Sequence, residues 1–539
     1  MFFSRQIALL LSVLASLALA GTALAADLAS LVANLTQGGF SEREVAVSAM
    51  AASGETRAAP ILEALSAGQL YVRTADKLVV IGKADGNKFS LTEAITGKPA
   101  GSASEAELER VRVNNRLRGT IDAAVGSLTL MSPDARVRLQ AANSLFTRRD
   151  PSALAALDLA LAAEKDARIK RSMSEARAAI VLATPDSPPA AKLEAVALVR
   201  ERGDRDALGM LDVTAAAATA TPEVKAAATA AANSVRQVLA TWQAAQNVWY
   251  GISLGSVLLL AAIGLAITFG TMGVINMAHG EMVMLGAYTT FVVQDVIRAH
   301  APGLFEVSII IALPLAFLVS GAIGILIERT VIRFLYGRPL DTLLATWGLS
   351  LVLQQAVRSI FGPTNREVGS PSWMSGTFQL GQLNITYGRL WIIVFALVVF
   401  VSLILLLRRT PLGLYMRAVT QNRPMAAAMG IRTPRVDALT FGLGSGIAGL
   451  AGVALSQIDN VSPNLGQGYI IDSFMVVVFG GVGNLFGTLI GALTLGVVNK
   501  FLEPYAGAVL GKILVLVFII MFIQRRPRGL FALKGRSVE

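Results

Sequence analysis

Three polar side chains stand close together in an otherwise apolar stretch, GVINMAHGEMVMLGAY at residues 273–288. Asn276, His279 and Glu281 could belong to a catalytic centre, to a path for a polar molecule, or to a loop between two helices. No nucleophile or further metal ligand accompanies them in the sequence. We therefore expect a polar break between two helices that shapes a path, and treat a direct contact between His279 and a substrate as a separate question.

Other polar residues interrupt apolar sequence further along the chain. Each could line a path, but each could equally cap a broken helix, bond across helices or lie at a membrane boundary. Asp472 lies near a predicted helix break. The residues predicted to line a substrate path are Asn276, His279, Glu281, Thr346, Gln354, Gln355 and Asn484.

The elements that must position these residues are apolar runs long enough to cross a bilayer. A further region, 470–500, is too long for one span and is broken by Gly480–Asn484, so it predicts a re-entrant segment or two spans. The sequence thus predicts an all-α bundle of about eight transmembrane helices. The other runs lie at about 250–274, 280–297, 307–327, 340–361, 387–407, 436–457 and 507–524.

Composition agrees with a membrane protein. The 539 residues are 54% hydrophobic and only 15% charged, with a mean hydropathy of +0.59, which is too apolar for an ordinary soluble protein. The net charge of +11 is explained by basic cytoplasmic loops without invoking nucleic acid. The chain has no cysteine and hence neither a disulfide nor a cysteine metal site.

The N-terminus predicts a signal peptide over residues 1–25. Arg5 precedes an apolar run from Ile7 to Ala20, and the small residues Ala23 and Ala25 suit cleavage. The next residues would then begin outside the cytoplasm. Alternating spans place the arginine-rich connections 328–339 and 408–435 and the tail 531–539 in the cytoplasm, as the positive-inside rule requires.

Residues 26–245 are alanine-rich and soluble in character, and predict an extracytoplasmic domain. PDARVRLQAANSL and KDARIKRSMSEAR recur thirty-two residues apart, from Asp134 to Asp166, and two related helical stretches follow. A period in the thirties is typical of HEAT-like helical hairpins. Before them, residues 70–92 predict a small β-hairpin. This domain has no histidine or paired-carboxylate arrangement, so binding or scaffolding is the expected role.

The cytoplasmic segment 408–435 predicts a short helix with one smooth face. Arg417 opens a helix-compatible run, small residues follow at Ala426–Ala428, and Gly430 stops the helix. Such a helix between two spans suits docking into a groove on a partner.

Three motifs together resemble the permease subunits of ABC importers of the branched-chain amino acid and urea family. They are GLAITFGTMGVINMAHGEMVMLGAY at 264–288, RAVTQNRPMAAAMGI at 417–431 and GGVGNLFGTLIGA at 480–492. The resemblance covers residues 246–530, roughly half of the chain. It departs from the glutamate-containing form of the second motif, since Pro424 and Met425 precede the alanines. The resemblance implies an ATPase-coupling helix formed by Arg417, Asn422, Ala426, Ala427 and Gly430.

The resemblance further implies transport by alternating access without an enzymatic activity in this chain. Its expected partners are a second permease subunit, two ATPase subunits and a periplasmic substrate-binding protein, with ATP and magnesium on the ATPases and no cofactor here. A signal peptide and a long soluble extension are similar to the first permease subunit of urea-type importers. Urea is therefore the expected substrate. The expected location of the protein is the inner membrane of a bacterium.

Three alternatives stay open at this point. A branched-chain amino acid or short-chain amide importer fits the same motifs. A passive urea channel would need no coupling helix. A membrane receptor with the helical domain as sensor would need a cytoplasmic signalling domain, and the short sequence after Arg525 argues against it.

Two glycine motifs that imitate nucleotide sites have simpler explanations. GAVLGK at 507–512 is one residue short of a Walker A loop and is followed by Ile513, so we expect span-end packing and a snorkelling Lys512. Gly444, Gly446 and Gly449 lie in an apolar helix with no preceding strand, where small residues permit close helix packing.

Overall fold

The computed structural model describes residues 28–37, 39–52, 57–85 and 88–531. They belong to two compact units, Met1–Leu239 and Ala240–Glu539. The predicted signal peptide 1–25 and residues 532–539 of the predicted tail lie outside the described residues, so both assignments stay predictions.

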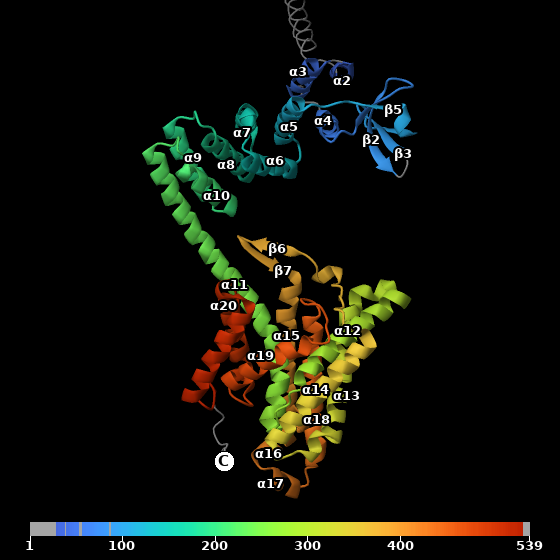
Figure 1. Cartoon of the computed structure of the whole chain (residues 1–539), viewed down its shortest axis with the longest axis vertical. Coiled ribbons are helices and arrows are strands. Elements are labelled where there is room, and N and C mark those ends of the chain that lie inside the picture. Colours follow the sequence, from blue (N-terminus) through green and yellow to red (C-terminus); the bar gives the residue numbers. More distant parts are fainter. Residues whose placement is uncertain (1–27, 38, 53–56, 86–87, 532–539) are drawn as a thin grey trace, which may run out of the picture. The chain divides into compact units, whose positions relative to one another are not determined.

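Among the residues that the structure describes, the first unit has three helices followed by an antiparallel sheet (Figure 1). A hydrophobic core shared by these helices and α5 includes Leu35, Met50, Leu65 and Leu117. The sheet has five strands in the order β4-β3-β2-β1-β5. The elements are α2 (Leu28–Gln37), α3 (Phe40–Ala52), α4 (Ala58–Ser66), β1 (Leu70–Arg73), β2 (Val79–Asp85), β3 (Lys88–Glu93), β4 (Pro99–Ala103), η1 (Glu105–Glu107), β5 (Leu108–Arg110) and α5 (Asn115–Leu130).

The sheet is larger than the predicted hairpin. The predicted part is present, because β1 pairs with β2 and β2 with β3 in antiparallel register. The prediction was wrong in stopping there, since β4 and β5 extend the sheet on its two sides. Both added strands are short, PAGSA and LER, and lack the alternation of large apolar and polar residues that marks a strand.

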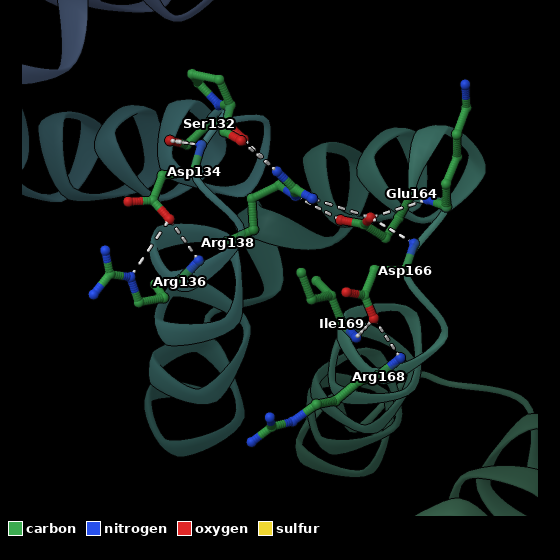
Figure 2. Close-up of polar contacts among 10 residues, drawn as sticks. Ser132, Asp134, Arg136, Arg138, Glu164, Asp166, Arg168 and Ile169 are labelled. Carbon is green, nitrogen blue, oxygen red and sulfur yellow. Dashed lines mark hydrogen bonds and ion pairs between the residues drawn. The ribbon is translucent and has the colours of Figure 1, made fainter.

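A succession of helices follows the sheet. Their starts coincide with the recurring aspartates: the Asp134 and Asp166 side chains each accept a hydrogen bond at 2.8 Å, from the backbone N–H of Arg136 and of Arg168 (Figure 2). The HEAT-like assignment itself stays a prediction. The helices are α6 (Ala135–Arg148), η2 (Pro151–Ala153), α7 (Leu154–Ala163), α8 (Ala167–Ala183), α9 (Pro189–Arg202), α10 (Arg205–Ala216) and α11 (Pro222–Met272).

The second unit is a helical bundle with one small hairpin, β6 (Thr377–Leu380) and β7 (Leu383–Thr386). Figure 1 shows α16 and α17 together at one end of this bundle. Its helices after α11 are α12 (His279–His300), η3 (Pro302–Val307), α13 (Ser308–Thr330), η4 (Ile332–Phe334), α14 (Pro339–Phe361), η5 (Ser372–Met374), α15 (Tyr387–Arg409), α16 (Pro411–Gln421), α17 (Arg423–Ala428), α18 (Thr433–Leu455), α19 (Leu465–Gly480) and α20 (Leu485–Arg525).

Five helical stretches among the described residues are long and apolar enough to cross a membrane, which fits a polytopic bundle. They are Pro222–Met272, Pro302–Phe334, Tyr387–Arg409, Thr433–Leu455 and Leu485–Arg525. Helices α12 and α14 have 22 and 23 residues but carry more polar side chains. The expected total of about eight spans therefore stays a prediction.

The region 470–500 is broken where the sequence predicted. Helix α19 ends at Gly480, and α20 begins at Leu485 after a turn in which Gly481 and Gly483 have φ angles of 104° and 80°. Helix α20 has a second irregularity, at Gly507, whose φ of 75° is outside the helical range. The predicted run 507–524 is therefore the second half of α20.

The glycines of α18 hold neighbouring helices close, as predicted. A Cβ atom at Gly444 would lie 2.7 Å from the carbonyl oxygen of Gly264 on α11. One at Gly446 would lie 2.7 Å from the Phe317 ring of α13. These approaches are possible only for glycine, so the motif serves helix packing.

Candidate functional site

The break between α11 and α12 is organised by Asn276. Helix α11 ends before Gly273, which has a φ of 69°. The side chain of Asn276 is 2% exposed, and its Oδ1 accepts a hydrogen bond from the backbone N–H of Ala278 at 3.0 Å. This interaction fixes the turn from which α12 starts.

His279, the first residue of α12, ties that helix to α11. It is buried, and its ring Nε2 lies 2.9 Å from the carbonyl oxygen of Ala261. Because a carbonyl only accepts, Nε2 carries the hydrogen. The ring also lies against Gly264, where a Cβ atom would come within 2.8 Å of its Cε1. The other ring nitrogen, Nδ1, is buried and has no hydrogen-bond partner. The contacts with Ala261 and Gly264 make His279 part of the packing between α11 and α12.

Glu281 faces α14 with one satisfied and one open oxygen. It is 1% exposed, and its Oε1 accepts hydrogen bonds from Ser350 Oγ at 2.8 Å and Gln354 Nε2 at 2.7 Å. Its Oε2 is buried and has no hydrogen-bond partner. Burying a carboxylate oxygen without a hydrogen-bond donor is unfavourable. The Oε2 atom of Glu281 can therefore accept a hydrogen bond from a further donor.

Helix α14 presents a continuous line of buried polar side chains to the start of α12. Residues four apart share one helix face, and Thr342, Thr346, Ser350 and Gln354 are all buried. Over twelve residues this line covers about 18 Å, more than half of the hydrocarbon thickness of roughly 30 Å. We define the polar seam as Asn276, Glu281, Thr342, Thr346, Ser350 and Gln354.

Thr346 connects the seam to the break. Its Oγ1 accepts a hydrogen bond from the backbone N–H of Met277 at 3.1 Å and lies 2.8 Å from the carbonyl of Thr342. Thr346 and Gln354 were predicted, whereas Thr342 and Ser350 were missed. The spacing of four residues from Thr346 and Gln354 was the signal that could have found them.

Two predicted path residues lie away from the seam. Gln355 follows Gln354 but is exposed, because adjacent helical residues point about 100° apart. Asn484 caps α20 instead: its Oδ1 accepts from the N–H of Gly487 at 3.1 Å, and its Nδ2 donates to the carbonyl of Phe531 at 3.3 Å.

Asp472 forms an ion pair that the sequence did not predict. Its Oδ2 lies 2.9 Å from Lys512 Nζ, and Asp472 is only 5% exposed. The Lys512 side chain is 50% exposed and lies shortly after the irregularity at Gly507. The expectation of a snorkelling Lys512 stays a prediction, to which the structure adds an ion pair with α19. The two partners are forty residues apart in the sequence, so no pattern within one helix could predict this pair.

The predicted coupling helix consists of two helices. Helix α16 contains Arg417 and ends before Asn422, whose Oδ1 caps α17 by accepting from the N–H of Met425 at 2.9 Å. The single helix expected over this segment was wrong because Asn422 has an extended backbone. Gly430, with a φ of 86°, ends the segment as predicted.

The alanines of α17 face in different directions. Ala426 is 5% exposed, whereas Ala427 is exposed. Arg423 anchors the helix by an ion pair with the buried Asp437 and lies over the Tyr336 ring at 4.7 Å. The outer face also carries Met425 and Met429, which are flexible apolar side chains suited to a binding surface.

Comparison with known proteins places this bundle in a family. Residues 247–523 match the family described as "Branched-chain amino acid transport system / permease component". The High-affinity branched-chain amino acid transport system permease protein BraD of Pseudomonas aeruginosa is 30% identical over 53% of this chain and 94% of its own length. The corresponding LivH protein of Salmonella typhimurium is 31% identical over the same shares.

A more distant relative is named for the import of a sugar and not of an amino acid. The Ribose import permease protein RbsC of Escherichia coli is 27% identical over 46% of this chain and 75% of its own length. No solved structure matches the chain. Since the family match covers half of the chain and includes both the polar seam and the two-helix segment, the protein belongs to the family of permease components of branched-chain amino acid transport systems.

Proposed function

We propose that this chain is the membrane-spanning subunit of an ATP-driven importer whose substrate is urea. The observation that carries the proposal is the composition of the polar seam, which has one formal charge, Glu281, and otherwise neutral hydrogen-bonding groups. Urea is small and neutral, with four N–H donors and one carbonyl acceptor. A seam of hydroxyl, amide and carboxylate groups complements such a molecule without requiring a compensating cation.

Glu281 is the residue on which urea recognition would depend. Its Oε2 has no protein donor, so an N–H of urea can supply one. Ser350 and Gln354 hold the other oxygen and so keep the carboxylate in place. The remaining predicted path residues act indirectly: His279 and Asn276 shape the break, and Asn484 and Gln355 lie outside the seam.

Branched-chain amino acids are the second candidate, favoured by the names of the relatives. A zwitterion would be better served by charges or helix ends, and the seam contains no lysine or arginine. Lys512 is already paired with Asp472. The similarity to a ribose permease supports a neutral polar substrate on a chain of this kind.

The first half of the chain supports the choice of urea. The relatives BraD and LivH are covered almost completely while nearly half of this chain has no counterpart in them. We propose that the signal peptide directs residues 26–245 to the periplasm, where this domain docks the substrate-binding protein. The remaining partners are a second permease subunit and two ATPase subunits that carry ATP and magnesium, with α17 as the contact to an ATPase.

Uptake of labelled urea and labelled leucine tests the substrate. Both are measured at low external concentration in urease-negative cells that lack the gene and in the same cells carrying wild type, Glu281→Ala or Gln355→Ala. We expect urea uptake to require the chain, to resist excess leucine and to fall about tenfold or more in Glu281→Ala, since a hydrogen bond to a charged group is lost. Gln355→Ala is the matched control and should transport normally. Leucine uptake in place of urea uptake would contradict the proposal.

A further inference from the structure

A cavity of about 1010 Å³ opens beside the two-helix segment, apart from the polar seam. Its walls are the C-terminal ends of α11 and α15, the helix α16, and the turn that leads into α20. Apolar side chains of Ile404, Leu407 and Phe486 line it together with the guanidinium groups of Arg408 and Arg417. A ligand there would meet apolar surface and positive charge at once.

Among the described residues, no acidic side chain lines this cavity beside its arginines. No Asp or Glu occurs in residues 240–272, 387–436 or 481–502, which include every wall. Among the ion pairs of the described residues none involves Arg408 or Arg417. Arg417 donates only to a backbone carbonyl, that of Leu407, at 2.9 Å. Both guanidinium groups therefore keep donors for an anion.

A close backbone contact fixes the two arginines on one wall. A Cβ atom at Gly413 would overlap the carbonyl oxygen of Leu407, so only glycine lets the first turn of α16 lie against the end of α15. Both this contact and the hydrogen bond from Arg417 hold α16 against Leu407, the residue that precedes Arg408. The fold therefore sets the backbone positions of Arg408 and Arg417, and both residues are exposed and accessible to a ligand.

We propose that this cavity binds an anionic phospholipid, with the phosphate between Arg408 and Arg417 and an acyl chain along the apolar wall. Basic pockets between membrane helices on the cytoplasmic side are suited to anionic headgroups. The apolar wall favours a lipid over an acidic segment of a partner protein, which would supply charge but no hydrocarbon chain. The proposal rests on the proposed orientation of the segment 408–435 and is independent of the transported substrate.

Native mass spectrometry of the full-length chain, purified in mild detergent with a mixture of phosphatidylglycerol and phosphatidylethanolamine, tests this. We expect wild type to retain phosphatidylglycerol selectively. Each arginine contributes about fivefold, or about 1 kcal/mol, so Arg408→Gln with Arg417→Gln should reduce retention by roughly 25-fold. The matched control is Arg409→Gln, a neighbouring arginine that does not line the cavity. It should leave retention unchanged.

The double lysine variant, Arg408→Lys with Arg417→Lys, preserves the charge and should keep most of the lipid if the variants fold. Equal retention of both lipids by wild type, or unchanged retention in the double glutamine variant, would overturn the proposal. Displacement of phosphatidylglycerol by millimolar inorganic phosphate alone would identify a free-anion site instead. Loss of ATPase copurification in the glutamine variant without any change in lipid would identify a protein contact. None of these readouts uses transport, so the failure of the urea proposal would leave them interpretable.

Discussion

Glu281 brings together the strongest chemical features of the bundle, a carboxylate buried between α12 and α14 with one oxygen held by two donors. The other oxygen has none, and a buried polar atom without a partner costs about 1–3 kcal/mol. A residue retained only for packing would gain by losing that charge. Under the proposed function, the N–H of urea supplies the missing donor.

The variant Glu281→Gln separates these two roles. Glutamine has nearly the same shape and can still accept from Ser350 and Gln354 through its carbonyl, so the midpoint of thermal unfolding in detergent should change by only a few degrees. Urea uptake should nevertheless fall about tenfold or more, because the open acceptor is replaced by a donor. Loss of folding in proportion to the loss of uptake would instead assign Glu281 a packing role.

The residue scale also shows what sequence could and could not predict about the site. Asn276, Glu281, Thr346 and Gln354 were recognisable because polar side chains interrupt apolar runs. That Glu281 meets Ser350 and Gln354, about seventy residues later, was not. A pattern within one helix reports which face is polar, but the partner of that face depends on how helices pack.

At the scale of elements, α18 holds the bundle together through glycines at its contacts with α12 and α13. A Cβ atom at Gly286 of α12 would overlap the carbonyl oxygen of Gly449. Such contacts were predictable in kind from the spacing of small residues. Strands β4 and β5 were not predictable in this way, because they are short and their residues carry no periodic signal.

We expect Gly286→Ala to destabilise the bundle by about 1–3 kcal/mol, because the added methyl group must push α12 away from α18. Gly348→Ala is the matched control: it lies within α14, and a Cβ atom there would have nothing within 4 Å. Alanine should stabilise that helix by up to about 1 kcal/mol. Thermal unfolding of the two variants in detergent measures the difference, and equal midpoints would contradict the packing described for α12 and α18.

In the first unit, an ion pair links α6 to the residue after α7. Arg138 Nε lies 2.6 Å from Glu164 Oε2, and this hydrogen bond lowers the pKa of the Glu164 carboxyl below its ordinary value (Figure 2). A lowered pKa in the folded state stabilises the unit above the ordinary carboxyl pKa of about 4.3, and this contribution is lost as the pH falls through the folded value.

Glu164→Gln should therefore lower the unfolding midpoint of the first unit by a few degrees at neutral pH and have little effect at about pH 3. Arg136→Gln is the control, because its side chain is 92% exposed and lies 4.0 Å from Asp134. Circular dichroism of the full-length chain across this pH range would follow the change. An equal loss at both pH values would show that Glu164 acts through packing alone.

At the scale of the whole molecule, the broad class was predictable and the detail was not. Apolar runs, basic connections and three motifs led to a permease, and the family match agrees. The division of the coupling segment at Asn422 and the Asp472–Lys512 pair depend on backbone conformation and on long-range contact.

The central claim is that the chain carries urea by a mechanism driven by ATP. It is tested most directly in proteoliposomes that contain the chain with its partner subunits and binding protein, by measuring the ratio of internal to external labelled urea. We predict a ratio well above one with enclosed hydrolysable ATP and a ratio near one with a non-hydrolysable analogue. Met429→Asp, at the exposed residue directly after α17, should reduce the ATP-driven ratio towards one. Equilibration to a ratio of one at the same rate with and without ATP, unaffected by this substitution, would contradict the account and identify a passive channel.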